Sequence, residues 1–286
     1  MRKTLQLMKK RMKKLLIRTL AAAVFAFLTF FCLLSGKYFF AAYMLFIMCG
    51  MMLEFLRIAD ADRHRAVTAL CLATAVVFFA ALFAIYAFDL PAALAGITVF
   101  PLILLMSSSI FLKDKEDFKT YPVYLTALLY LAVPVSLSNV LVLGGGEFRG
   151  ALLLCFFIIV WCTDVGAYLT GMALGQKYGG KLCPEISPKK SWIGFWGSIF
   201  FAGFGAFLLN RFGMWDVPAL QSIVIGIIMA VAGTAGDLFE SMWKRRGGVK
   251  DSGNLIPGHG GLLDRFDSSL FAIPAGAASL AIINLL

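Results

Sequence analysis

Charged residues are scarce in this sequence. Asp, Glu, Lys and Arg together make up 15% of the 286 residues, whereas a soluble globular domain carries about 25%. Hydrophobic residues make up 60%, and the mean hydropathy is +0.86. The chain therefore lacks the polar side chains needed to cover a soluble globule of this size, and we predict an integral membrane protein.

Several familiar sequence patterns are also missing. The six cysteines show no C-x-x-C spacing, so we assign none of them a metal or redox role. The sequence contains no internal repeat, no low-complexity tract and no change in composition that would mark a soluble domain. We therefore expect one multi-pass membrane domain over 1–286, with N-terminal helices in 1–150 and the chemically distinctive half in 151–286. No feature indicates a nucleic-acid partner.

Polar residues divide the apolar sequence into about nine stretches of roughly 17 to 25 residues, the length that a helix needs to cross a bilayer. Pro101 and Pro134 are expected to kink their helices. We predict an all-α polytopic bundle with spans at 17–35, 38–56, 66–88, 91–112, 122–143, 150–174, 192–210, 219–243 and 268–286.

Lysine and arginine are distributed unevenly among the predicted loops. If the N-terminus is cytoplasmic, 23 of the 26 cations fall in cytoplasmic segments, and only Lys37, Arg149 and Arg211 fall outside. This asymmetry follows the positive-inside rule and predicts a cytoplasmic N-terminus. A signal peptide would also begin with basic residues, but the apolar run is long and lacks a small-residue cleavage pattern, which favours an uncleaved anchor.

Asp164 lies inside the sixth predicted span and Asp237 inside the eighth. A carboxylate at that depth is costly unless it faces a polar cavity, a cation or a metal. Asp237, Glu240 and Ser241 share one helical face by their spacing. The glycines nearby suit close helix packing, which is the interpretation that we prefer for them.

Two basic segments flank the predicted spans. The loop 176–191 carries four lysines, and a flexible basic loop beside buried carboxylates suits a polyphosphate with its magnesium. Most basic cytoplasmic loops only set the topology, so this loop alone is weak support. The segment 241–267 adds four more candidate phosphate ligands, Lys244, Arg245, Arg246 and Lys250, and six glycines whose backbone amides could approach an anion.

Asp264 and Asp267 form a D-x-x-D pair at the start of the ninth span. At i and i+3 of a helix, the two carboxylates project to one side and suit a divalent metal. Arg265 between them leaves a structural salt bridge open as the alternative.

The segment 241–267 resembles the signature of the phosphatidate cytidylyltransferases, the CDP-diacylglycerol synthases. The matching residues are Ser241, Lys244, Arg245, Lys250, Asp251, Gly253, Ile256, Pro257, His259, Gly260, Gly261, Asp264, Arg265 and Asp267. An upstream block is also similar to that family: Asp164, Ala167, Tyr168, Gly171, Lys181, Leu182, Pro184, Ile186, Ser187, Pro188 and Lys190. The sequence departs from the family pattern at two positions. Trp243 stands where the signature usually has an aliphatic residue, and Ile193 stands where the upstream block usually has Glu.

The resemblance implies that CTP and phosphatidate give CDP-diacylglycerol and pyrophosphate at a bacterial inner membrane, with Mg²⁺ as the cofactor, and it leaves a second cation open. Asp264 and Asp237 would bind metal, with Asp267 and Asp164 as further carboxylates. The resemblance also allows a homodimer. The substrate-binding residues would be Lys181, Ser187, Lys190, Ser241, Lys244, Arg245, Asp251, Gly260, Gly261 and Arg265, with Lys250 in the catalytic set.

His259 belongs to the implied catalytic set, but phosphatidate is largely ionised at neutral pH and needs little general-base help. A donor to phosphate or a loop-organising role is therefore the expectation for His259. Two alternatives stay open for the whole chain. A CTP-dependent lipid kinase or a related CDP-lipid synthase would carry similar residues, and an ion-coupled transporter would also place carboxylates and glycine-broken helices in a bundle.

Overall fold

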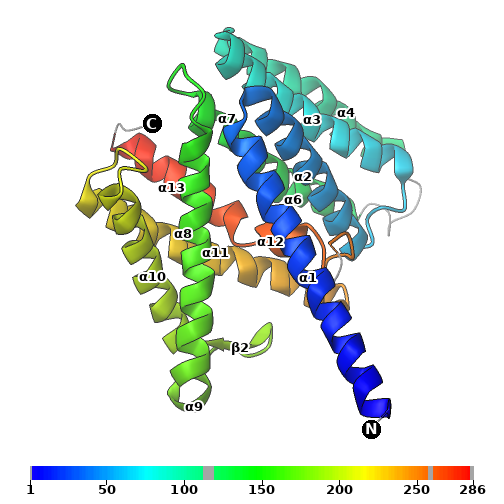
Figure 1. The fold of residues 1–286 in the computed structure, drawn as a ribbon. Helices are drawn as coiled ribbons and strands as arrows, with labels where there is room; N and C mark the ends of the chain where they lie inside the picture. The colour runs from blue at the N-terminus through cyan, green and yellow to red at the C-terminus, as the bar shows by residue number, and fades with distance from the viewer. Residues whose placement is uncertain (1, 112–118, 257–259, 284–286) are drawn as a thin grey trace.

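The computed structural model describes residues 2–111, 119–256 and 260–283, with the backbone alone described at 2–11, 13–15, 17, 18 and 176. Its described residues form a helical bundle (Figure 1). Seven helical segments of these ranges are long and apolar enough to cross a membrane, which confirms an all-α polytopic architecture. They span Lys37–Ile58, Arg65–Phe88, Ala92–Phe111, Tyr121–Leu143, Gly150–Gly175, Trp192–Arg211 and Ala219–Arg246.

The first and last predicted spans are not among these seven segments. Helix α1 runs over Arg2–Leu34, and the stretch Thr19–Leu34, where side chains are described without a gap, is apolar. Helix α13 covers Ser269–Ile282 and follows the short helix α12, Leu263–Phe266. The count of nine crossings therefore stays a prediction.

Both prolines that were predicted to kink helices lie in irregular segments. Pro134 has no N–H to donate to the preceding turn, and the helix widens into a π-helical turn just before it. Pro101 lies in the first turn of a helix that begins and ends in 3₁₀ geometry. The two irregular segments are η1 Ala92–Thr98, α4 Val99–Ser107 and η2 Ser108–Phe111, and then α6 Tyr121–Ala127, η3 Leu128–Ala132 and α7 Val133–Leu143.

The basic segment that the sequence predicted as a flexible loop is instead a β-hairpin, and in this respect the prediction was wrong. The hairpin follows helix α8 (Gly150–Thr170), η4 (Gly171–Gly175) and α9 (Gln176–Tyr178). Strand β1 (Lys181–Cys183) pairs antiparallel with β2 (Ser187–Ser191). Ser191 Oγ then accepts a hydrogen bond from Gly194 N and caps the first turn of helix α10, Trp192–Arg211. The cap fixes the hairpin to the next crossing.

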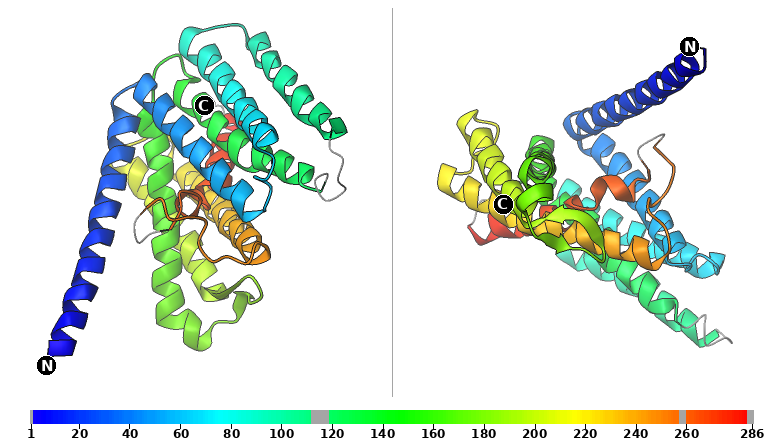
Figure 2. Two further views of the ribbon diagram at one scale, coloured as in Figure 1. Left: turned by 90° about the vertical axis from the view of Figure 1, so that its right-hand side faces the viewer. Right: turned by 90° about the horizontal axis from the view of Figure 1, so that it is seen from below.

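Helices α8, α10, α11 (Ala219–Arg246) and α13 pack against one another in one part of the bundle. Helices α3 (Arg65–Phe88) and α4 lie on the opposite side, and α1 diverges from the body toward its N-terminus (Figure 2). Helix α2 (Lys37–Ile58) lies between these parts and is buried at Met48, Met51, Met52, Phe55 and Leu56.

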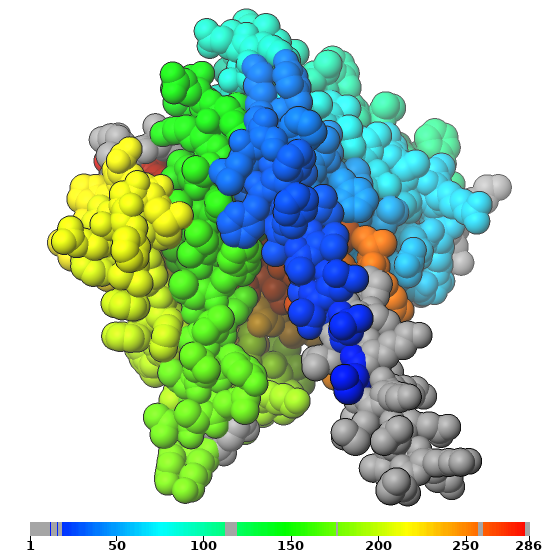
Figure 3. Space-filling model, viewed as in Figure 1, coloured from blue at the N-terminus to red at the C-terminus, as the bar shows by residue number. Residues whose placement is uncertain are grey.

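The N-terminus and the hairpin lie at one end of the molecule, whereas the turn between α1 and α2 and the C-terminus lie at the other (Figure 1). The space-filling view shows a hollow between α8 and α1, with orange to red atoms from the last part of the chain at its floor (Figure 3). The C-terminal segment therefore reaches the side of the bundle as well as its interior.

Candidate functional site

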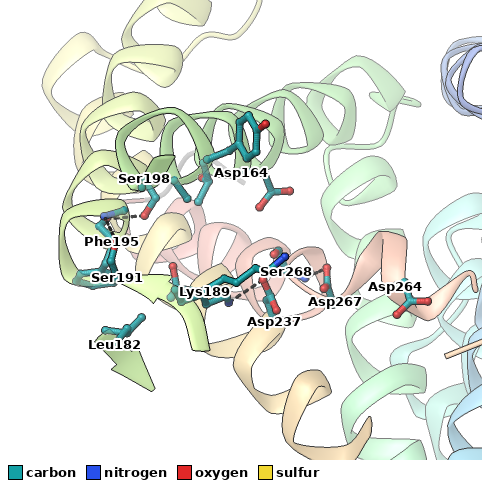
Figure 4. A pocket seen from close by; sticks show the side chains of 17 residues that line it. Asp164, Leu182, Lys189, Ser191, Phe195, Ser198, Asp237, Asp264, Asp267 and Ser268 are labelled. Carbon is teal, nitrogen blue, oxygen red and sulfur yellow. Dashed lines mark hydrogen bonds and ion pairs between the residues drawn. The ribbon is translucent and has the colours of Figure 1, made fainter. Parts of the chain in front are cut away.

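A cavity of about 370 Å³ lies between α8, the hairpin, α10, α11 and the residues around α12. All four carboxylates that were predicted to bind metal line it, although they come from three separate segments (Figure 4). Its lining consists of Thr163, Asp164, Ala167, Tyr168, Gly171, Leu182, Lys189, Lys190, Ser191, Gly194, Phe195, Ser198, Thr234, Asp237, Asp264, Asp267 and Ser268. The helical positions of the acidic residues thus converge as the sequence predicted.

Asp237 lies on the face of α11 that borders the cavity and is held from two directions. Its Oδ2 is 2.7 Å from Lys190 Nζ, which reaches across from β2. Its Oδ1 accepts a hydrogen bond of 3.2 Å from Ser241 Oγ, one turn further along α11. The predicted placement of Asp237 and Ser241 on one helical face is therefore confirmed, and the hairpin is tied to α11 by an ion pair.

Asp267 approaches Asp237 because Gly236 leaves room for its backbone. A Cβ at Gly236 would lie 2.6 Å from the Asp267 carbonyl oxygen. The Asp267 Oδ1 accepts a hydrogen bond of 2.7 Å from Ser268 N. Burial raises the pKa of Asp267 well above its usual value, and the charges of Asp237, Glu240 and Asp164 raise it further. Acidic groups are thus concentrated at this end of the cavity.

Asp264 lies apart from the other three carboxylates, at the far side of the cavity (Figure 4). Its Oδ2 accepts hydrogen bonds from Ser252 N at 2.9 Å and Gly261 N at 2.8 Å. Its Oδ1 accepts from Lys244 Nζ at 2.7 Å. Burial alone would raise the pKa of Asp264, but the hydrogen bonds from Lys244, Gly261 and Ser252 outweigh it, and the pKa lies below its ordinary value.

Lys244 is enclosed between two carboxylates. Besides Asp264, its Nζ contacts Glu240 Oε2 at 2.5 Å, and the Glu240 side chain is fully buried. The three side chains form a buried triad that joins α11 to α12. In this arrangement Lys244 stabilises the site internally, which differs from the predicted phosphate contact.

The donor set suits a hard divalent cation. Mg²⁺ prefers carboxylate oxygens, and Asp164, Asp237 and Asp267 present them to one cavity. Asp267 lies among three other carboxylates, so a bound cation would offset charge that Lys190 alone does not balance. Within the described residues, no three acidic, histidine or cysteine side chains already stand close enough to form a metal site. The residues fit the predicted cation by chemical type and by the charge of the cavity.

Other predicted residues surround the site rather than line it. Arg245 donates from Nε to the Ile186 carbonyl oxygen at 3.3 Å and from Nη1 to the Val249 carbonyl oxygen at 3.1 Å, so it ties the hairpin to the loop after α11. His259 lies outside the described residues. Of the predicted residues that are described, those absent from the cavity lining are Lys181, Ser187, Ser241, Lys244, Arg245, Lys250, Asp251, Gly260, Gly261 and Arg265.

Sequence reasoning missed two residues, Lys189 and Glu54. Lys189 lines the cavity beside Lys190, and its position in the basic segment was the available signal. Glu54 lies far from the signature in sequence, yet it contacts the loop before α12. Its only signal was an acidic residue within an apolar run.

A family model described as the cytidylyltransferase family matches residues 16–283. The chain belongs to the cytidylyltransferase family. This match confirms the resemblance drawn from the signature and extends it into the N-terminal half.

The curated relatives that this chain resembles are named phosphatidate cytidylyltransferase. The chain is 46% identical over 117 residues to the phosphatidate cytidylyltransferase of Bacillus subtilis, covering 41% of this chain and 42% of the relative. It is 48% identical over 127 residues to that of Haemophilus influenzae, covering 43% of each. It is 37% identical over 150 residues to that of Rickettsia bellii, covering 50% of this chain and 64% of the relative. The similarity thus spans less than two thirds of the length of each of these relatives.

Proposed function

We propose that this protein transfers the cytidylyl group of CTP to phosphatidate, giving CDP-diacylglycerol and pyrophosphate. Support comes from the family match and from the cavity, where acidic residues and the lysines of β2 stand together. A nucleoside triphosphate with its cation needs both kinds of group: cations offset phosphate charge, and carboxylates hold the metal. The convergence of Asp164, Asp237 and Asp267 on one cavity is the observation that carries the proposal.

In the proposed reaction, a phosphate oxygen of phosphatidate attacks the α-phosphorus of CTP. One P–O bond forms, the bond to the β-phosphate oxygen breaks, and the electron pair leaves with pyrophosphate. Because phosphatidate is ionised at neutral pH, no side chain has to remove a proton from it. Magnesium, when bound, would offset the charge that develops on the leaving group.

The ion pair between Lys190 and Asp237 suggests how the chain prepares for the nucleotide. The two groups are 2.7 Å apart and partly accessible, with 24% and 31% of their side-chain surfaces exposed. An incoming phosphate would take the place of Asp237 beside the Lys190 ammonium. Asp237 would then be free to join Asp164 and Asp267 around the cation. Lys189, on the same strand, lies at the cavity and would add positive charge beside the phosphates.

The membrane setting is part of the proposal. We expect a bacterial inner-membrane protein with about nine crossings, a cytoplasmic N-terminus and a cytoplasmic site. The charge asymmetry of the loops supports this orientation, and the N-terminus and hairpin lie at the same end of the molecule (Figure 1). The hollow between α8 and α1 provides a lateral route for a lipid (Figure 3). A homodimer stays a prediction.

A turnover assay tests the proposal. Purified protein in mixed micelles is incubated with Mg²⁺, phosphatidate and CTP labelled at the α-phosphate. We expect the label to enter the organic phase as a CDP-lipid, with one pyrophosphate released per product and none without phosphatidate. Release of CDP with phosphorylation of a lipid would instead identify a kinase. Absence of turnover, together with substrate uptake into vesicles, would favour a transporter.

A further inference from the structure

Helix α2 carries a buried acidic residue, Glu54, with 7% of its surface exposed. Its carboxylate accepts three hydrogen bonds from the segment that contains the signature. Oε2 accepts from Ser252 Oγ at 2.8 Å and from Leu263 N at 2.9 Å, and Oε1 accepts from Leu262 N at 3.0 Å. Among the described residues, no lysine or arginine forms an ion pair with Glu54. The polar contacts of the Glu54 carboxylate are therefore hydrogen bonds from this loop.

Ser252 connects Glu54 to Asp264. Its hydroxyl donates to Glu54, while its backbone N–H donates to Asp264 Oδ2 at 2.9 Å. The same hydroxyl oxygen accepts from Asp264 N at 3.3 Å. At the other end of the loop, the N–H of Gly261 goes to Asp264 and that of Leu262 goes to Glu54. The carboxylates of Glu54 and Asp264 thus both accept hydrogen bonds from each end of this loop.

Glu54 belongs to a face of α2 that is shaped to receive this loop. Gly50, one turn earlier, lies so close to the loop that a Cβ there would be 2.4 Å from Leu262 Cδ1. Ile58, one turn later, is just as close to the end of α11: its carbonyl oxygen would be 2.4 Å from a Cβ at Gly247. These α2 positions are spaced at i, i+4 and i+8, so they lie on one side of the helix. Helix α2 of the N-terminal half therefore packs directly against the signature loop and the end of α11.

Packing alone does not require a carboxylate at this position. Burying an ionised group without a cation is costly, and an apolar side chain would fill the space at lower cost. A carboxylate offers acceptors in fixed directions to several donors at once, which an apolar residue cannot do. The hydrogen bonds themselves are thus the reason for an acid here.

We propose that Glu54 is a positioning residue for the reaction, which fixes Asp264 at the cavity through Ser252 and the amides of the loop. The inference rests on the proposed function for its catalytic consequence. It adds to that function a residue of the second crossing, far from the signature in sequence.

The test compares Glu54→Gln, Glu54→Asp and Ser252→Ala with the wild-type protein in the CTP assay. Gln keeps the shape of the Glu54 side chain but replaces one acceptor oxygen with an N–H₂ group. That group then faces a donor of the loop instead of accepting its hydrogen bond. We expect kcat to fall by about 10- to 100-fold, as for other residues that orient a site indirectly, while KM for CTP changes by less than about threefold. Glu54→Asp, which keeps the charge on a shorter side chain, should retain more activity. In the double variant, Ser252→Ala should add little to Glu54→Gln, because both act through one chain of contacts.

Hydrogen exchange supplies a readout independent of activity. The amides of Ser252 and Gly261 donate to Asp264 and not to Glu54. Faster exchange at these two amides in Glu54→Gln would therefore show that the hydrogen bonds to Asp264 are weakened as well. This measurement remains informative if the wild-type protein shows no CTP turnover, an outcome that would count against the proposed function alone.

Two control variants separate positioning from general destabilisation. Phe40→Leu disturbs a buried ring of α2 that packs on Phe148, away from the loop. It should lower the melting temperature without changing kcat per folded protein or the exchange at Ser252 and Gly261. Glu147→Gln removes an exposed carboxylate and should change nothing. The proposal is overturned if Glu54→Gln keeps wild-type exchange at both amides, or if its kcat per folded molecule equals that of Phe40→Leu.

Discussion

Asp264 and Asp267 are three residues apart, yet their surroundings predict opposite effects on stability when each is changed to Asn. Asp264 accepts hydrogen bonds from Lys244, Ser252 and Gly261. Asp267 is buried among other carboxylates. Asp264→Asn should therefore destabilise the protein, whereas Asp267→Asn should leave its stability unchanged or raise it.

The magnitudes follow from the contacts. In Asp264→Asn, the side-chain amide can still accept from the loop amides, but its N–H₂ group then faces the Lys244 ammonium. Removing one partner of a buried ion pair costs about 3 to 5 kcal/mol. Lys244 keeps Glu240 at 2.5 Å, so we expect a smaller loss, about 2 to 3 kcal/mol. In Asp267→Asn, the relief of repulsion should contribute about 1 kcal/mol of stabilisation.

The two variants are unfolded with a denaturing detergent in mixed micelles, in the presence of a metal chelator. The chelator is needed because a bound cation would reverse the repulsion around Asp267. A thiol-reactive fluorophore reports unfolding as the buried Cys71 and Cys155 become accessible. Turnover of CTP is measured on the same samples, and Asp267→Asn should lose activity by about 100-fold while remaining folded.

Two results would contradict these roles of Asp264 and Asp267: an Asp264→Asn variant as stable as the wild-type protein, or an Asp267→Asn variant that is clearly less stable. The first result would mean that the hydrogen bonds to Asp264 add no net stability. The second would mean that Asp267 has a cationic partner without any bound metal. Wild-type turnover by Asp267→Asn would remove it from the proposed cation site.

Two further predictions concern the hairpin and the loop. Lys190→Gln leaves Asp237 without its cation and removes a proposed phosphate contact, so KM for CTP should rise by about tenfold; an unchanged KM in steady-state kinetics would exclude Lys190 from nucleotide binding. Gly261→Ala places a Cβ 2.1 Å from Ser252 Oγ and 2.2 Å from Glu54 Oε2, so the loop must shift and both melting temperature and kcat should fall. Gly248→Ala is the matched control, because Gly248 has a positive φ of 68° but open space around it. This variant should lose only about 1 to 2 kcal/mol of stability to backbone strain, and its kcat should be retained. Equal effects of the two glycine variants on kcat would contradict the close contact described for Gly261.

The sequence alone predicted the membrane class and the convergence of the acidic residues. Apolar stretches of crossing length were separated by polar segments, and Asp164 and Asp237 were conspicuous because a carboxylate is costly at that depth. The signature placed Asp264 and Asp267 beside them. These predictions depended on local composition and spacing, which determine helices in a membrane more directly than in water.

What the sequence could not predict were the partners of each charge. Lys244 was expected to contact phosphate because it is basic and lies in the signature, but its ion pairs with Glu240 and Asp264 depend on how α11 and α12 pack. The hairpin was missed because its strands are short and basic, without the apolar alternation that marks a strand. Glu54 contacts residues about 200 positions away in sequence, and no local pattern reports such a contact.

The seating of the signature loop on α2 limits how parts of this protein could be exchanged with those of a relative. A chimera that takes only the C-terminal half from another species would place a foreign loop on Gly50 and Glu54 of the recipient, and a foreign end of α11 on Ile58. Any mismatch in side-chain size there would be transmitted to Asp264, although every signature residue was still in place. Functional grafts between such proteins should therefore include the second helix along with the signature.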